Sequence, residues 1–135
     1  MNEKKNDKSE DEFKNKVIVG LTEYVTINSS SNSKEVISRM DTGATKSSID
    51  ISLAAELKLG PVIDSRLIKS AHGTKLRPVV EVSVIIRGKG MKARFTVADR
   101  CHMRYPVLIG QNILKQGFLI DPNRRVDIPL KVNKE

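Results

Sequence analysis

Hydrophobic residues alternate with polar ones along many short segments of this chain, which is the two-residue period of a half-buried β-strand. The clearest case is the stretch VEVSVII at 80–86, where every second residue is Val or Ile. Strands are predicted over 17–27, 35–40, 47–51, 63–69, 75–86, 91–97, 105–109, 118–121 and 124–130. Helices are predicted over 53–59, with Ser52 as N-cap, and over 111–116. Short strands with two short helices predict a mainly β fold, a small closed β-barrel.

The chain has 135 residues, which is enough for one domain with its own core. Residues 1–16 are almost wholly charged or polar, so we expect a disordered tail there and a folded domain over 17–135. No apolar run approaches the roughly 20 residues of a membrane-spanning helix, and the first residues lack the apolar stretch of a secretory signal. We therefore expect a cytoplasmic protein with no membrane partner.

The net charge of +8 is carried entirely by the predicted domain. Residues 1–16 contain five lysines and five acidic residues, which leaves 19 basic and 11 acidic residues elsewhere. A basic domain favours acidic partners, either nucleic acid or an acidic peptide. The alternative is a solvated surface that only keeps the protein in solution.

One segment combines an apolar strand with residues suited to acid chemistry. The strand 35–40 runs directly into Asp41-Thr42-Gly43-Ala44, and Gly43 permits a sharp turn beside the carboxylate. A second apolar segment, Val107 to Gly110, precedes the second predicted helix. Asp-Thr-Gly alone is a weak signal, and Asp41 could be an ordinary turn residue, but this order of elements is typical of aspartic proteases.

Several segments together resemble a known family. They are DTGATKSSID, VIDSRLIKSAHGTKLRPVV, FTVADRCHMRYPVLIGQNIL and FLIDP, within about residues 36–122. They are similar to the bacterial and archaeal family labelled ATP-dependent zinc protease, whose members are retropepsin-like. The resemblance implies an acid-protease barrel, hydrolysis of peptide bonds as an aspartic endopeptidase, association with ATP-grasp ligases and, in some members, processing of glutamate chains.

The chemistry of this class needs two carboxyl groups, and this chain offers one Asp-Thr-Gly. Hydrolysis without a metal or a nucleophilic side chain requires one group to activate water and another to donate a proton. Two adjacent carboxyls that share one proton supply both roles, as in the general pattern of aspartic proteases. A small barrel cannot hold a second such loop, so we expect a homodimer in which each subunit contributes Asp41.

The resemblance also assigns roles around Asp41. Thr42 would bond across the dimer axis, Gly43 would contact the substrate backbone, and Ala44 completes the loop. The tip of the 63–86 hairpin would close over the substrate as a flap that comprises Ser70, Ala71, His72, Gly73 and Thr74. Where retroviral enzymes have an acid and an Arg that support the loop, this chain has Thr45 and Gln111, after Ile109 and Gly110, and we expect a neutral Thr–Gln contact.

Cofactors are not expected. His72 and His102 are 30 residues apart and join no His-Glu-x-x-His or Cys pair, so the sequence gives no support to zinc. Gly88-Lys89-Gly90 is too short for a phosphate-binding loop, which leaves ATP unsupported. Cys101 is interpreted as a buried small hydrophobic residue, since a single cysteine can form no intrachain disulfide.

The rival hypothesis is a catalytically silent dimeric barrel that binds nucleic acid or an acidic protein. Nucleic acid is disfavoured because four of the five aromatic residues, Tyr24, Phe95, Tyr105 and Phe118, fall at predicted core positions and leave no stacking platform. An acidic peptide is the favoured substrate. The expected contacts are the basic residues that flank the flap, namely Arg66, Lys69, Lys75 and Arg77.

Overall fold

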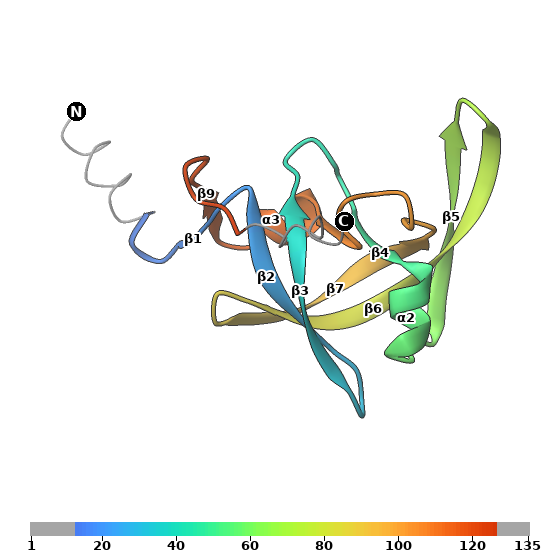
Figure 1. Cartoon of the computed structure of the whole chain (residues 1–135), viewed down its shortest axis with the longest axis horizontal. Helices are drawn as coiled ribbons and strands as arrows, with labels where there is room; N and C mark the ends of the chain where they lie inside the picture. Colours follow the sequence, from blue (N-terminus) through green and yellow to red (C-terminus); the bar gives the residue numbers. More distant parts are fainter. Residues whose placement is uncertain (1–12, 127–135) are drawn as a thin grey trace, which may run out of the picture.

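The computed structural model describes residues 13–126 of the chain, and its elements are those of a small β protein (Figure 1). The strands are β1 (Val17–Val19), β2 (Thr22–Asn28), β3 (Ser33–Met40), β4 (Ser47–Asp50), β5 (Val62–Ser70), β6 (Gly73–Ile86), β7 (Lys89–Ala98), β8 (Val107–Ile109) and β9 (Phe118–Ile120). The helices are α2 (Ile51–Glu56) and α3 (Gln111–Leu114). Among the described residues, no helix is long and apolar enough to cross a membrane.

Six strands close into a barrel. They follow the order β2-β3-β8-β4-β7-β6, and β2 pairs back onto β6 to complete the ring. The interior is filled by side chains with no exposed surface, among them Ile27, Val84, Phe95 and Ile109. Burial of each such side chain contributes about 1.5–3 kcal/mol. The mainly β barrel predicted from the alternation is therefore confirmed.

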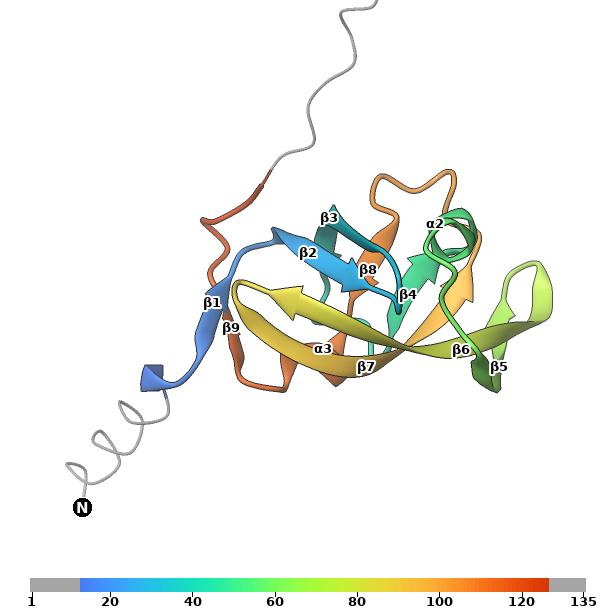
Figure 2. The same cartoon turned by 90° about the horizontal axis from the view of Figure 1, so that it is seen from below.

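The long strand β6 belongs to the barrel and also to a projecting hairpin. Its second half pairs with β2 and β7, whereas its first half pairs with β5 from Val62–Val80 to Ser70–Gly73. Figures 1 and 2 show this β5–β6 hairpin extending away from the barrel, beside α2. Among the strands that the structure describes, β5 pairs only with β6, and this hairpin carries the tip that the sequence analysis proposed as a flap.

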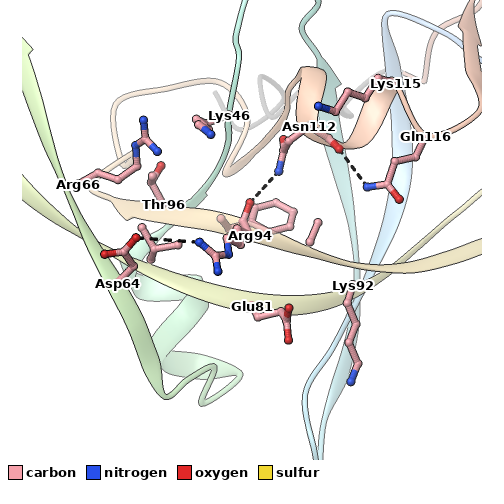
Figure 3. Close-up of a pocket in the computed structure, with 13 residues that line it drawn as sticks. Lys46, Asp64, Arg66, Glu81, Lys92, Arg94, Thr96, Asn112, Lys115 and Gln116 are labelled. Atoms are coloured by element: carbon pink, nitrogen blue, oxygen red, sulfur yellow. Dashed lines mark hydrogen bonds and ion pairs between the residues drawn. The ribbon is translucent and has the colours of Figure 1, made fainter.

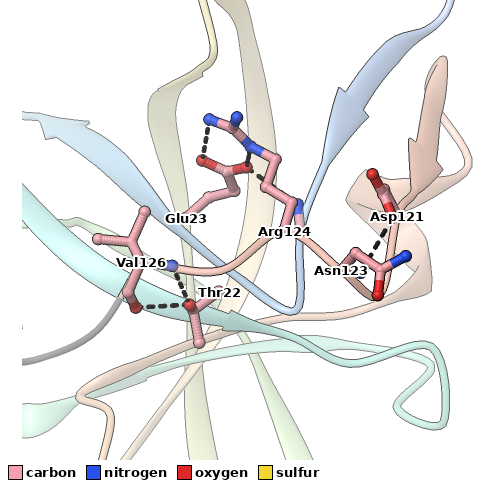
Figure 4. A network of polar contacts seen from close by, with 7 residues as sticks. Thr22, Glu23, Asp121, Asn123, Arg124 and Val126 are labelled. Carbon is pink, nitrogen blue, oxygen red and sulfur yellow. Dashed lines mark hydrogen bonds and ion pairs between the residues drawn. The ribbon is translucent and has the colours of Figure 1, made fainter.

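The two ends of the described chain are tied together. Strand β1 pairs in parallel with β9, and the segment after β9 returns to β2. There the carboxylate of Glu23, which is only 2% exposed, binds the Arg124 side chain and accepts a bond from the Gly20 N–H (Figure 4). The Thr22 hydroxyl accepts from the Val126 N–H and donates to the Val126 carbonyl. Bonding to Glu23 raises the pKa of Arg124.

Three local predictions need correction. The strand predicted over 17–27 is interrupted at Gly20 and Leu21, where the Leu21 N–H donates to the Arg124 carbonyl at 2.9 Å and Leu21 is 40% exposed. Residues 124–126 form no strand, since the Arg124 N–H bonds to Asp121 in a turn, and the rest of that prediction lies outside the described residues. The first helix begins at Ile51, two residues before the predicted start, and Asp50, not Ser52, caps it. Residues 1–12 of the predicted tail also lie outside the described part.

Candidate active site

Asp41 stands directly after β3, at the position where that strand leaves the barrel. Parallel pairing of β3 with β8 sets Arg39 opposite Leu108 and Met40 opposite Ile109. One further hydrogen bond extends the pairing of β3 with β8 beyond Met40, since the Asp41 N–H donates to the Ile109 carbonyl at 2.8 Å. The candidate catalytic residue is thereby held by the second apolar segment that the sequence singled out.

The Asp41 loop also fixes its own carboxylate. The Gly43 N–H donates to Asp41 Oδ1 at 2.9 Å, and the Ala44 N–H donates to the Asp41 carbonyl at 3.2 Å. Asp41 is partly buried, while Thr42 and Gly43 are exposed. The loop therefore presents one oriented carboxylate at the molecular surface.

The start of α3 supports the loop from behind. A side chain at Gly110 would lie within 2.8 Å of the Ala44 carbonyl oxygen and closer still to Lys46, so only glycine fits there. The Gln111 N–H donates to the Ala44 carbonyl at 2.8 Å, and the Gln111 side chain donates to the Thr42 carbonyl at 2.7 Å. The neutral support predicted for Gln111 is present, but its acceptor is the Thr42 backbone and not the Thr45 side chain.

A second support was missed in the sequence. The Ser47 hydroxyl is fully buried, accepts from the Gly110 N–H at 2.9 Å and lies 2.7 Å from Asn112 Oδ1. The Asn112 amide in turn donates to the Arg94 carbonyl at 3.0 Å. These bonds join β4, α3 and β7 behind the loop. The local sequence around a buried hydroxyl in a strand seldom indicates that it has a structural role. The one clue to Ser47 was its position three residues after Ala44, at the end of the Asp41 loop.

The register of the flap separates the four basic residues proposed to contact substrate. Arg66 pairs with Arg77, and Ile68 pairs with Lys75, so these side chains share one face of the hairpin. Lys69 pairs with Thr74 and points to the opposite face. Lys69 therefore cannot act together with the other three.

The flap tip itself is a tight turn. Strand β5 ends at Ser70 and β6 begins at Gly73, which leaves Ala71 and His72 between them. Gly73 has φ of +109°, a conformation that favours glycine. The tip from Ala71 to Thr74 is exposed, as expected of a segment that closes over a ligand.

A group of arginines near Asp41 was not singled out from the sequence. Arg39, Arg100 and Arg104 line a pocket of about 290 Å³ whose other walls include Tyr105 and Leu108. Arg100 is partly buried, its Nε donates to the Tyr105 carbonyl, and its N–H donates to Asp50. Burial lowers the pKa of Arg100, the Asp50 carboxylate opposes that effect, and Arg77 and Asp41 act on the same guanidinium through space. Arg77 on the flap and Asp41 in the loop thus both lie within electrostatic reach of Arg100.

Comparison with known families adds to this geometry. A family model described as RimB-like, the retropepsin-like aspartic endopeptidase RimB, matches residues 53–129, more than half of the chain. The chain belongs to the RimB-like family of retropepsin-like aspartic endopeptidases. The match covers the flap and the Val107–Gly110 segment, and it begins after the Asp41 loop.

Solved structures place this RimB-like chain among retropepsin-like folds. A Legionella pneumophila protein of unknown function is 16% identical over 81% of this chain and 95% of its own, with a TM-score of 0.56. The simian foamy virus (mac) protease is 18% identical over 70% of this chain and 91% of its own, with a TM-score of 0.54. The EIAV protease in complex with the inhibitor HBY-793 is 25% identical over 70% of this chain and 84% of its own, with a TM-score of 0.55. No curated protein matches the sequence.

Two interpretations of single residues are wrong in this RimB-like structure. Cys101 is exposed and not buried, and its hydrogen bond with the Asp99 carboxylate raises the pKa of the thiol and lowers that of Asp99. Tyr24 is 47% exposed on the outside of β2, whereas Phe95, Tyr105 and Phe118 are buried as predicted. One isolated exposed ring on β2 still falls short of a stacking platform.

The zinc in the resembling family's label has no matching ligand set here. In the part of the chain from 13 to 126, no three His, Cys, Asp or Glu side chains gather in a way that could hold a metal ion. The RimB-like model names an aspartic endopeptidase.

Proposed function

We propose that the chain is an aspartic endopeptidase in which Asp41 of two identical subunits forms the catalytic pair. The observation that carries this proposal is the Asp41 carboxylate, oriented by the Gly43 N–H at 2.9 Å in a loop anchored to Ile109 and Gln111. One carboxylate of the pair removes a proton from water as it attacks the peptide carbonyl. The other carboxyl donates its proton, so that the departing amine leaves neutral.

The single Asp-Thr-Gly supports the homodimer. A lone carboxyl cannot act as base and acid at once, so a chain of this family needs a second copy to complete the site. Thr42 and Gly43 are exposed beside Asp41, as residues at a subunit axis must be in the separated chain. In the dimer, Thr42 would bond across the axis and the two flaps would close over one substrate.

We also propose that the substrate is an acidic, Glu-rich peptide. Arg39, Arg100 and Arg104 line one pocket beside Asp41, and Arg77 lies within electrostatic reach of Arg100 from the flap. Arg100 is already penalised by burial, so a substrate carboxylate placed beside it would be stabilised more strongly than at a fully exposed arginine. The family resemblance leads us to expect an ATP-grasp ligase as a partner as well, which co-purification can test.

Asp41→Asn tests the mechanism. Asn is nearly isosteric but can neither take up nor release the shared proton, so cleavage should fall by roughly 10²–10⁴-fold or more while the fold and the dimer persist. Activity is measured on a Glu-rich fluorogenic peptide, and folding by circular dichroism and sedimentation. Glu35→Gln, the same acid-to-amide change at an exposed position on β3, is the control and should keep its activity. Equal rates for Asp41→Asn and the parent chain would refute the proposal.

A further inference from the structure

A basic pocket lies beside the catalytic loop but does not include it. It has a volume of about 340 Å³, and Figure 3 shows its lining residues coming from the Asp41-side loop, from β5, β6 and β7, and from α3. Neither residues 41–44 nor the flap tip lines it. The pocket is therefore separate from the candidate active site, although Lys46 on its wall follows Asp41 by only five residues.

Cations dominate the pocket wall. The cations are Lys46, Arg66, Lys92, Arg94 and Lys115, and the acids are Asp64 and Glu81. Arg94 and Asp64 face each other at 4.0 Å. Lys46, Arg66, Lys92 and Lys115 have no ion pair within the described residues. Positive charges brought together in this way repel one another, so a bound anion would relieve an unfavourable arrangement.

The pocket is coupled to the catalytic loop through shared elements. Asn112 lies on the pocket wall and bonds to the Arg94 carbonyl, while its neighbour Gln111 holds the Thr42 carbonyl. Arg66 reaches the pocket from the same hairpin that carries the flap (Figure 3). The pocket and the Asp41 loop therefore share the α3 support and the β5–β6 hairpin.

We propose that this pocket is an auxiliary subsite that binds an acidic side chain of the substrate at a distance from the scissile bond. The proposal rests on the proposed protease function and adds a requirement for substrate length. A peptide is favoured over nucleic acid because the pocket wall offers no surface on which a base could stack. The only aromatic ring on the wall, Phe95, is fully buried and offers no face for a base.

Because the subsite binds substrate away from the reacting atoms, it acts on affinity and not on the chemical step. Long acidic peptides should have a lower KM than short ones, with similar kcat. Loss of the subsite should raise KM for the long peptide only.

The test uses the full chain carrying Asp41→Asn, so that binding is measured without cleavage. Fluorescence anisotropy compares a short Glu-rich peptide with the same peptide extended by glutamates at both ends. In this background Arg66→Gln with Lys115→Gln removes two exposed cations from different walls. The extended peptide should bind roughly three- to tenfold more weakly to this variant, because each exposed pair contributes about 0–1 kcal/mol. The short peptide should bind equally to both proteins.

Lys69→Gln is the matched control, since it removes the same charge from the opposite face of the β5–β6 hairpin. It should leave the binding of both peptides unchanged. Three outcomes would overturn the proposal. The double variant could weaken the binding of both peptides equally, or it could leave the binding of the extended peptide unchanged. The extended peptide could also fail to bind the Asp41→Asn chain that keeps both cations. A single-stranded oligonucleotide of equal charge that binds more tightly than the peptide and depends on the same two cations would overturn it as well. The protease function fails separately, if the chain with Asp41 intact cleaves neither peptide.

Discussion

The Asp41 loop keeps its shape because Gly110, packed behind it, has no side chain. A Cβ at this position would overlap the carbonyls of Ala44 and Lys46, which are backbone atoms and cannot move independently of the loop. Gly110→Ala should therefore reduce peptide cleavage strongly and destabilise the fold by roughly 1–3 kcal/mol, the usual range for overpacking. Gly90→Ala is the control, because its nearest neighbour would be 3.8 Å away. Urea unfolding and cleavage rates measure the two effects, and a fully active Gly110→Ala would contradict the assigned role of this loop.

At the same scale, Arg77 and Lys69 are two cations of the flap that lie on opposite faces of the hairpin. Arg77→Gln should raise KM for a Glu-rich peptide by up to about fivefold, since one partly exposed charge pair contributes about 0–1 kcal/mol. Lys69→Gln should leave KM unchanged. The effect of Arg77 should shrink as salt is added, because exposed charges are screened beyond about 8 Å at physiological ionic strength. If the two substitutions changed KM equally, or if the effect of Arg77→Gln did not depend on salt, the flap would have no role in recognising an acidic peptide.

Among the elements, α2 depends on one carboxylate. Asp50 is 8% exposed and accepts bonds from the N–H groups of Ser52, Leu53 and Arg100. Asp50→Ala should destabilise the fold by about 2–3 kcal/mol, through the loss of the cap and of a partner for Arg100. Asp50→Asn keeps an acceptor oxygen and should cost less. Chemical denaturation gives both values, and equal stability of the Ala variant and the parent would show that the cap is dispensable.

The elements also show how far the sequence could predict the structure. Periodicity located the β5–β6 flap, the β6–β7 hairpin and the apolar β8 because their alternation is local. The interruption of the first strand at Gly20 and Leu21 could not be predicted from local sequence, since the Leu21 N–H there bonds to Arg124, about a hundred residues away. The hydrogen bond between Ser47 and Asn112 could not be predicted either, because these residues are far apart in the sequence. That Lys69 and Arg77 lie on opposite faces of the hairpin follows from the alternation of side chains along paired strands. It could be recognised only once the pairing register of β5 and β6 was known.

For the whole molecule, the proposed dimer would determine whether the proposed active site forms. The resemblance to retroviral proteases would place an intersubunit sheet at the chain ends, whereas within residues 13–126 β1 pairs with β9 of the same chain. We therefore predict a weak dimer held mainly by the Thr42 region and the flaps. Specific activity should rise with protein concentration, and sedimentation should show dimer formation over the same range. A monomer that is fully active at high dilution would disprove the shared site.

The anchoring of the Asp41 loop by α3 also has a consequence for the newly made chain. Thr42 and its support Gln111 are separated by 69 residues, so the loop cannot adopt its final shape while the second half is still being translated. At about 5–20 residues per second, that interval lasts roughly 3–14 seconds, and pairing of such distant segments is itself slow. A polypeptide emerging from the ribosome therefore exposes Asp41 before Gln111 can support the loop that holds it.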